Sequence, residues 1–239
     1  MKVLICAGNG GVGQGLIRAI RERYPDAEIA ATYRSRKPEN TSADVHWYQA
    51  DLTHRDSVGK LAESVTQVDW LINCAGFLHH HTHDGFQGPE KSIRQFEPDF
   101  FLHNIQHNTL PTLLLAQHFS SALKKSTRGI FAAVSAKVGS IEDNQLGGWY
   151  SYRASKAALN MALKTLSIEW QRSHKHLCVA ALHPGTTDTG LSEPFQTNVP
   201  EGKLFTPEQT GHYLLNVLEQ LTPEQTGSFF SWNGETLPW

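Results

Sequence analysis

Residues 3–13, VLICAGNGGVG, decide the fold of this chain. The apolar run Val3–Ala7 predicts a buried strand, and Leu16, Ile17 and Ile20 follow at helical spacing. The segment between strand and helix matches the pattern G-x-G-x-x-G, with the residues Gly8, Asn9, Gly10, Gly11, Val12 and Gly13. Glycines at such a turn let backbone N–H groups and the helix N-terminus approach a pyrophosphate. The segment predicts a dinucleotide-binding turn; a glycine-rich turn without a ligand is the alternative.

Outward from this segment, short apolar runs alternate with helical patterns along the whole chain. Strands are predicted at residues 3–7, 29–33, 45–50, 68–74, 129–134, 177–182 and 229–232, with helices between them. This alternation predicts a parallel sheet with helices on both faces. We therefore expect one α/β domain over residues 1–239, a Rossmann fold with about seven parallel strands. Residues 77–90 are rich in His and Gly and are predicted to form a polar loop, and residues 108–124 a helix.

The composition narrows the class of protein. A hydrophobic content of 39% in 239 residues is enough for a sizeable core, and a formal charge of −2 gives no basic excess for nucleic acid or an anionic membrane. No stretch approaches the roughly 18 apolar residues of a membrane span, and the first apolar run is too short for a signal peptide. The three cysteines lie in apolar runs, as packed and reduced thiols do. We expect a cytoplasmic protein.

The end of the second predicted strand bears on the choice of dinucleotide. Arg34 and Arg36 follow this strand, whereas the nearest acidic residues precede it. Arginines suit the 2′-phosphate of NADP, and a carboxylate at this point suits NAD. The sequence therefore favours NADP(H) over NAD(H), with a solvated basic loop as the alternative. Asp51-Leu52, after the third strand, is a candidate for holding the adenine edge; a helix-capping role for Asp51 is the alternative.

Tyr152 and Lys156 form the candidate catalytic pair. They are four residues apart and share one face of a predicted helix. A free Tyr has a pKa of about 10, which is too high for efficient proton transfer at neutral pH. We expect the Lys156 ammonium to lower the pKa of Tyr152. The pair predicts acid/base catalysis of carbonyl–alcohol chemistry.

Several segments beyond the glycine turn together resemble the short-chain dehydrogenase/reductase family. They are Asn73-Cys74-Ala75-Gly76, Asn108, Ser135, residues 152–156 and His183-Pro184-Gly185-Thr186-Thr187-Asp188-Thr189. Within it, residues 138–141, 147–150 and the ending 232–239 resemble the C-factor-like and sniffer-type carbonyl reductase branch. The resemblance extends over nearly the whole chain. It implies a homodimer or homotetramer that acts on a small-molecule carbonyl or alcohol.

The resemblance also implies a role for each matching residue. Tyr152 is the general acid in reduction, and Lys156 lowers its pKa and binds the nicotinamide ribose. Ser135 orients the substrate oxygen, and Asn108 holds a water that links Lys156 to solvent. The remaining implied residues line the cofactor: Asn73, Ala75, Gly76, Pro184, Gly185, Thr187 and Thr189.

The sequence departs from the family pattern at two points. The family has three residues between the first two glycines of its turn, whereas two separate Gly8 from Gly11, so the turn is expected to be one residue shorter. The family often has Ser-Ser after the fifth strand, with the second Ser catalytic, and here the pair is Ser135-Ala136. Ser135 is the favoured replacement. The alternatives are that Ser140 reaches the site or that the role is weakened.

The histidines at positions 79, 80, 81 and 83 suggest a metal site at first. No cysteine or acidic cluster accompanies them, so we expect no metal and read the segment as a substrate-side loop. The predicted function is NADP(H)-dependent interconversion of a carbonyl and an alcohol. The alternative is a dinucleotide-binding regulatory or signalling protein, similar to C-factor, in which turnover is not the main role.

Overall fold

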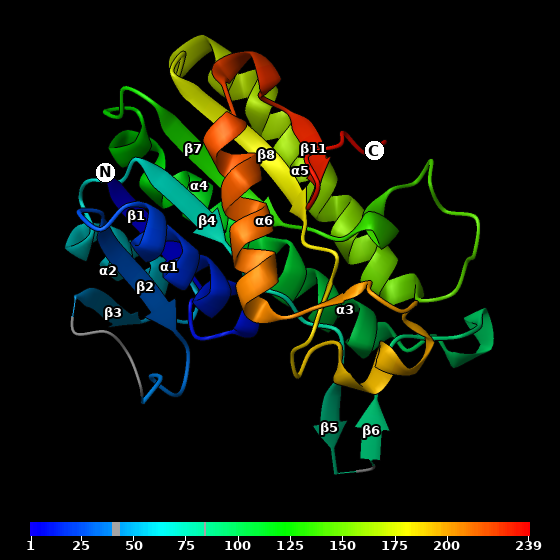
Figure 1. Cartoon of the computed structure of the whole chain (residues 1–239). Helices are drawn as coiled ribbons and strands as arrows, with labels where there is room; N and C mark the ends of the chain where they lie inside the picture. The colour runs from blue at the N-terminus through cyan, green and yellow to red at the C-terminus, as the bar shows by residue number, and fades with distance from the viewer. Residues whose placement is uncertain (40–43, 84) are drawn as a thin grey trace.

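A computed structural model describes residues 1–39, 44–83 and 85–239. Its centre is a seven-stranded sheet in which every pairing is parallel, in the order β11-β8-β7-β4-β1-β2-β3 (Figure 1). The strands are β1 (Lys2–Cys6), β2 (Glu28–Tyr33), β3 (Val45–Gln49), β4 (Trp70–Asn73), β7 (Gly129–Val134), β8 (Leu177–His183) and β11 (Ser228–Ser231). The predicted single-domain Rossmann fold with seven parallel strands is confirmed.

Helices cover both faces of this sheet (Figure 1). Apolar residues of α1 (Gly11–Arg23) and α6 (Pro207–Gln220) pack on one face, with Leu16 and Leu214 among them. The other face is covered by α2 (Arg55–Ser64), α4 (Leu110–Leu123) and α5 (Tyr150–Ser173). Successive residues of one strand point to opposite faces, so the continuous apolar runs in the sequence are explained by burial on both sides.

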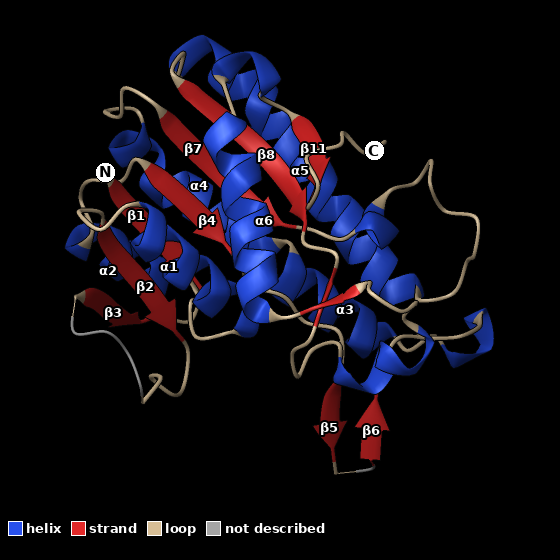
Figure 2. Ribbon diagram, in the orientation of Figure 1, coloured by secondary structure: helices blue, strands red, loops and turns tan. Residues whose placement is uncertain are grey.

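Two segments beyond the carboxyl ends of the strands differ from the predictions. Residues 77–90, predicted as an irregular loop, contain the antiparallel pair β5 (His80–Thr82) and β6 (Gly85–Gln87), which projects from the body of the molecule (Figure 2). Asn108 was predicted near the start of a helix but is the last residue of α3 (Pro98–Asn108). Pro111 explains this boundary, because proline suits the first turn of the new helix α4 and breaks the interior of a longer one.

A further parallel pair, β9 (Thr186–Thr187) and β10 (Leu204–Phe205), lies between β8 and α6. The helix α6 begins with the capping box that Thr206 and Gln209 form with each other's backbone. The cysteines Cys6, Cys74 and Cys178 are free thiols. In the described part of the chain, no helix is long and apolar enough to cross a membrane.

Candidate active site

Ala7 occupies a left-handed position at the start of the glycine-rich turn. Its φ is +54°, a conformation that glycine adopts without steric cost and that alanine adopts with one. Its N–H donates to Thr32 Oγ1 at 2.8 Å, and its carbonyl accepts from Gly10 N at 3.1 Å. Three residues separate Ala7 from Gly11. The expectation of a shortened turn, counted from Gly8, was wrong: Ala7 takes the place of the first glycine and the turn has full length.

The rest of the turn fits a phosphate-bearing ligand. A Cβ atom added to Gly13 would lie 2.7 Å from Gly8 Cα, so packing of helix on strand requires this glycine. A Cβ on Gly10 would come no closer than 3.5 Å to another atom, so the protein's own packing does not require glycine there. Gly10 is the N-cap of α1 and no side chain caps this helix, which leaves the N–H groups of its first turn available to an anion.

Arg34 and Arg36 are exposed on the segment that follows β2, next to this turn. Asn9 Nδ2 donates to the Arg36 carbonyl at 3.4 Å, which ties the turn to the basic segment. The guanidinium of Arg36 forms an ion pair with Glu39. The two guanidinium groups are therefore candidates to bind a further phosphate of a dinucleotide whose pyrophosphate lies at the glycine turn.

Asp51 and Leu52 have local structural partners. Asp51 Oδ1 accepts hydrogen bonds from Thr53 N at 2.9 Å and Thr53 Oγ1 at 2.7 Å, just before α2. Burial raises the pKa of Asp51, but the hydrogen bonds from Thr53 and the charges of His54 and Arg34 together leave the pKa below its ordinary value. Leu52 is buried in the apolar core. The structure thus gives Asp51 a turn-forming role beside any contact with a ligand.

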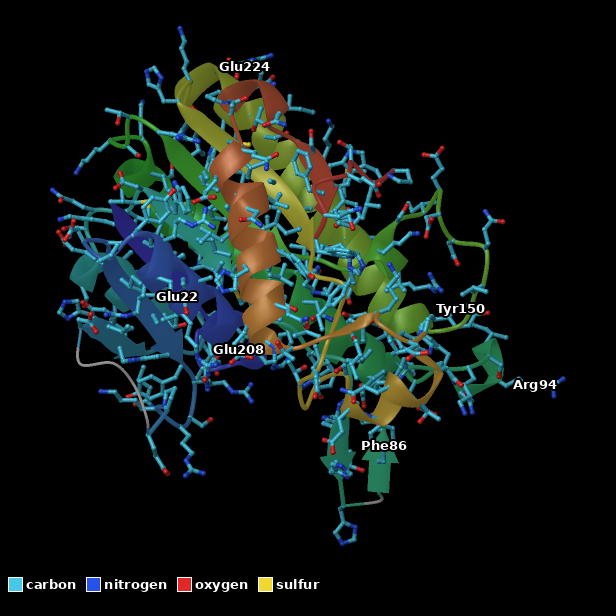
Figure 3. The ribbon with its side chains drawn as sticks, viewed as in Figure 1. Glu22, Phe86, Arg94, Tyr150, Glu208 and Glu224 are labelled. Carbon is cyan, nitrogen blue, oxygen red and sulfur yellow. The ribbon has the colours of Figure 1, made fainter. Side chains whose placement is uncertain are left out.

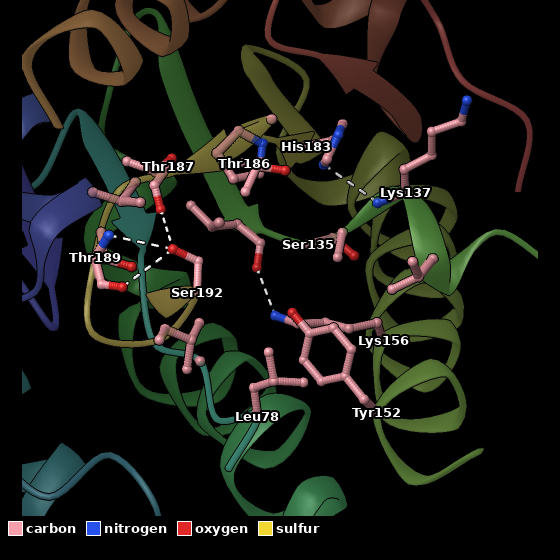
Figure 4. Close-up of a pocket in the computed structure, with 18 of the residues that line it drawn as sticks. Leu78, Ser135, Lys137, Tyr152, Lys156, His183, Thr186, Thr187, Thr189 and Ser192 are labelled. Carbon is pink, nitrogen blue, oxygen red and sulfur yellow. Dashed lines mark hydrogen bonds between the residues drawn. The ribbon is translucent and has the colours of Figure 1, made fainter. Parts of the chain in front are cut away.

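Tyr152 and Lys156 project from α5 into one cavity of about 250 Å³ (Figure 4). Both side chains are buried, and Lys156 Nζ lies 5.8 Å from the centroid of the Tyr152 ring. Lys156 Nζ donates to the Val134 carbonyl at 3.0 Å, at the end of β7. The helix thus brings the predicted pair together at the carboxyl edge of the sheet, where ligands bind in folds of this class.

Burial dominates the acidity of this pair. It raises the pKa of Tyr152 well above its ordinary value and lowers the pKa of Lys156 to about 8. The net shift of the Tyr152 pKa in the polypeptide alone is upward because desolvation of the phenolate dominates it, and the effect of Lys156 on this pKa stays a prediction. A phenol with a raised pKa stays protonated at neutral pH but is a weaker acid, so proton transfer from it depends on positive charge that stabilises the phenolate.

The serine position differs from the favoured prediction. Ser135 lines the cavity, but its hydroxyl donates to Asn160 Oδ1 at 2.6 Å. Ser140 Oγ donates to the Trp239 carbonyl at 3.2 Å and is not among the residues that line this cavity. Ala136 lines the cavity directly and has no hydroxyl. In this arrangement neither serine directs a proton toward the cavity.

Asn108 is held by hydrogen bonds on both sides of its amide. Its Oδ1 accepts from Phe77 N at 2.7 Å, and its Nδ2 donates to the Phe77 carbonyl and to Ser155 Oγ, each at 2.9 Å. The side chain therefore fastens the segment after β4 to α5, the helix that carries Tyr152 and Lys156. A relay water would have to bind the main-chain carbonyl of Asn108, because the side-chain amide is already engaged.

The two segments that complete the cavity come from the ends of β4 and β8. Cys74, Ala75 and Gly76 line it, whereas the Asn73 amide turns inward, donating to Thr112 Oγ1 at 2.9 Å and accepting from Ala75 N at 3.0 Å. From β8 onward the cavity is lined by His183, Pro184, Gly185, Thr186, Thr187 and Thr189. A Cβ on Gly11 would lie 2.4 Å from Thr189 Cγ2, so this loop closes directly over the glycine turn.

Glu90 is a site residue that the sequence analysis did not assign, whereas Trp149, just before the candidate catalytic Tyr, was a candidate for the wall of the substrate pocket. The buried Glu90 carboxylate accepts hydrogen bonds from Ser151 N, at 3.0 Å, and from Ser151 Oγ, and so satisfies the N-terminus of α5. Trp149 has a left-handed backbone (φ +54°, ψ +40°) and lines the cavity 6.1 Å from the Tyr152 ring centroid. The Gly147-Gly148 pair before Trp149 was the available signal, because both glycines have φ of +64°.

The histidine-rich segment has aromatic neighbours. His80 Nε2 lies 2.7 Å from Gln87 Oε1, across the β5–β6 pair. The His79 ring lies near those of Phe86 and Phe195, with ring centroids 5.2 and 5.7 Å away. Within the described residues, no group of three or more His, Cys, Asp or Glu side chains is arranged to hold a metal ion.

Comparison with known proteins agrees with this geometry. The sequence pattern of the family described as short chain dehydrogenase matches residues 2–200. The 1-hydroxy-2-glutathionyl-2-methyl-3-butene dehydrogenase of Rhodococcus sp. (strain AD45) is 28% identical over 241 residues, 99% of each chain. C-signal of Myxococcus xanthus is 33% identical over 132 residues, 55% of this chain and 74% of that one. The NADPH-bound carbonyl reductase from chicken fatty liver has a TM-score of 0.86 at 25% identity, covering 100% of this chain and 94% of that structure.

Proposed function

The chain belongs to the short-chain dehydrogenase family, and from that premise we propose that it interconverts a carbonyl and an alcohol with NADP(H). The observation that carries the proposal is the shared cavity of Tyr152, Lys156 and the loop that closes over the glycine turn. When bound, the cofactor supplies or accepts the hydride. The turn Gly8–Gly13 would hold its pyrophosphate, and Ala75, Gly76, Pro184, Gly185, Thr187 and Thr189 its nicotinamide half.

Tyr152 is the proposed proton donor in the reducing direction. Its phenol is protonated at neutral pH, and because burial raises its pKa, proton donation relies on stabilisation of the phenolate by positive charge. The alkoxide that forms on the substrate takes that proton. Lys156, buried beside the phenol, is the proposed ligand of the nicotinamide ribose, and its charge stabilises the phenolate left behind.

Ser135 and Asn108 take modified roles in this proposal. Because the Ser135 proton is directed to Asn160, we assign the substrate oxygen one donor, Tyr152, and treat the serine role as weakened. Ala136 marks the place on the cavity wall where a second donor is missing. Asn108 positions α5 through its amide, and its main-chain carbonyl is the proposed site of a relay water.

NADP(H) is favoured by charge on the loop after β2. Arg34 and Arg36 are exposed beside the turn, and Asn9 joins the turn to Arg36. Guanidinium groups bind phosphate through charge-assisted hydrogen bonds. The chicken carbonyl reductase of the same fold has NADPH bound.

Exposed apolar residues support the proposal of a homodimer or homotetramer. Three apolar residues are exposed on two helices: Leu113 (45%) on α4, and Met161 (65%) and Ile168 (54%) on α5. Such residues on neighbouring helices suit an interface between copies of the chain. Light scattering coupled to gel filtration measures the assembly.

A regulatory role is the second candidate, and Ala136 favours it together with the similarity to C-signal. A protein that binds dinucleotide without needing turnover tolerates the loss of a substrate-orienting hydroxyl. The experiment that separates the two candidates is NADPH oxidation against a panel of aldehydes, ketones and quinones, with cofactor titration by fluorescence. Turnover on the panel supports the enzyme. Tight NADPH binding without turnover supports the regulatory candidate.

A further inference from the structure

A second cavity of about 710 Å³ lies beside the cavity of Tyr152 and Lys156. It is bounded by the segment 86–100, by the 3₁₀ segment Glu193–Asn198 and by the residue that precedes α5. Trp149 and Phe195 line both cavities. The two spaces therefore meet at this aromatic pair.

A row of aromatic rings leads from the reacting phenol to the second cavity. The Trp149 centroid lies 6.1 Å from that of Tyr152 and 5.1 Å from that of Phe195, and Phe86 lies 6.3 Å beyond Phe195. Figure 3 labels Phe86 on the hairpin and Tyr150, the first residue of α5, toward the same end of the molecule. Rings in such a row suit a flat, unsaturated group of the substrate.

Trp149 is held in this position from several sides. Its left-handed backbone conformation costs free energy for a non-glycine residue, and the preceding pair Gly147-Gly148 continues the same conformation. The Trp149 N–H donates to the Glu90 carbonyl, and Arg153 Nε donates to the Gly148 carbonyl at 3.0 Å. The fold thus fixes the indole at the junction of the two cavities.

The second cavity has polar side chains of its own along its wall. The Thr197 hydroxyl and the Asn198 amide line it and, within the described residues, form no hydrogen bond with another protein group. Lys91 and Glu97 also line it, with opposite charges, and Glu90 adds a carboxylate that is already bonded to Ser151. These hydrogen-bonding groups are exposed to solvent and accessible to a ligand, and two carboxylates against one ammonium on the wall suit an uncharged polar ligand better than an anion.

We propose that the second cavity binds the distal part of the substrate, and that this part is an uncharged, amide-bearing tail. The substrate class is then an aromatic or unsaturated carbonyl compound, or the matching alcohol, joined to such a tail. The flat group beside the reacting carbon contacts Trp149 and Phe195, while the tail binds Thr197 and Asn198. This inference rests on the proposed function for the chemistry at the carbonyl carbon.

Three aldehydes with the same para-carboxamide test the inference. They are 4-formyl-N-methylbenzamide, N-(4-formylbenzoyl)glycylglycinamide and 4-formyl-N-heptylbenzamide, so that the tail is absent, polar or apolar. We expect kcat/KM for the glycylglycinamide to exceed both others at least tenfold. Thr197→Trp, at an exposed position, places an indole in the cavity, so we expect the three aldehydes to have nearly equal kcat/KM values in this variant. Leu146→Trp, at a site 92% exposed and outside both cavities, is the matched control and keeps the wild-type ratio.

Binding keeps this test separate from turnover. Analogues with a carboxamide in place of the aldehyde are titrated calorimetrically in the presence of NADP. We expect the glycylglycinamide analogue to bind at least tenfold more tightly than the other two, and we expect Thr197→Trp to lose this difference. That result supports binding in the second cavity even if no aldehyde is reduced. Absence of reduction would refute the proposed function alone. Equal affinities, or equal kcat/KM values for all three aldehydes, overturn the inference.

Discussion

The Ser135 hydroxyl donates a hydrogen bond of 2.6 Å to Asn160 Oδ1, from the end of β7 to the middle of α5. The proton that would orient a substrate oxygen is therefore used inside the protein. Ala136, the next residue, lines the cavity of Tyr152 and Lys156 without a side-chain donor. Position 135 thus contributes a bond within the protein, and position 136 is where a hydroxyl could face the substrate. Substitutions that remove the hydroxyl at 135 or add one at 136 test this assignment.

Ala136→Ser restores a donor to the cavity wall. We expect kcat for carbonyl reduction to rise roughly tenfold or more, because a donor aimed at a developing oxyanion strengthens in the transition state. Steady-state kinetics with NADPH measure the change. Ser135→Ala is the companion variant, and we expect it to lower the free energy of unfolding by about 1–2 kcal/mol through the lost bond to Asn160. If kcat does not rise in Ala136→Ser and turnover is lost in Ser135→Ala, then Ser135 is the residue that orients the substrate oxygen.

Arg34→Ala tests the cofactor preference. Removing one charge-assisted phosphate contact costs about 1.5–3 kcal/mol, so the Kd of NADPH should rise roughly tenfold or more while that of NADH changes little. Fluorescence titration of both cofactors gives the two constants. Arg94→Ala, an exposed arginine on a distant 3₁₀ turn, serves as the control for overall charge. An equal loss for NADPH and NADH would rule out the 2′-phosphate assignment.

Asn108→Ala separates positioning from proton relay. The variant removes the bonds of Asn108 to the Phe77 N–H and carbonyl, and Ser155 Oγ keeps only its bond to the Tyr152 carbonyl, so we expect the free energy of unfolding to fall by about 2–4 kcal/mol. Turnover falls as α5 loses its link to the segment after β4, and NADPH affinity stays near the wild-type value. Thermal melting, kinetics and titration on the same preparation measure all three. An unchanged melting temperature with reduced turnover would contradict the positioning role.

His183 predicts acid sensitivity of the fold. Burial, aided by the charge of Lys137 and opposed by that of Asp143, lowers the pKa of His183 to about 4 from an unfolded value of about 6.5. The unfolded chain then binds more protons than the folded one between these values. Stability conferred by neutral His183 is present above pH 6.5 and is lost, by at most about 3 kcal/mol, as pH falls toward 4.

Urea unfolding at pH 7, 5.5 and 4.5 measures this loss. His183→Asn keeps a hydrogen-bond acceptor near Lys137 N, which His183 Nδ1 contacts at 3.3 Å, and removes the titration. Its stability should therefore fall less over the same range than that of the wild type. Parallel pH curves for the two proteins would show that His183 does not contribute.

Local sequence signals predicted the parts of the site that depend on neighbours along the chain. The apolar runs located all seven strands of the sheet, and the four-residue spacing of Tyr152 and Lys156 placed them on one helical face. The role of Ala7 was not predicted, because alanine rarely adopts the left-handed conformation and its identity gives no sign of it. A backbone conformation of this kind is set by the strand and helix that the turn joins.

Contacts between distant segments were beyond the sequence. Glu90 caps α5 through Ser151, 61 positions later, and no local pattern links a carboxylate in a His-rich segment with a helix so far away. The choice between Ser135 and Ser140 likewise depended on Asn160 and Trp239, whose positions follow from tertiary packing. The upward shift of the Tyr152 pKa follows from the depth of burial, which the local sequence does not reveal.

The central claim is that the phenol of Tyr152 donates the proton in a carbonyl reduction. Tyr152→Phe removes one oxygen atom and keeps the buried ring. With the best carbonyl from the panel, we predict that kcat for NADPH oxidation falls between about a hundredfold and ten-thousandfold, while the variant still binds NADPH in fluorescence titration. Wild-type turnover in Tyr152→Phe would contradict the account.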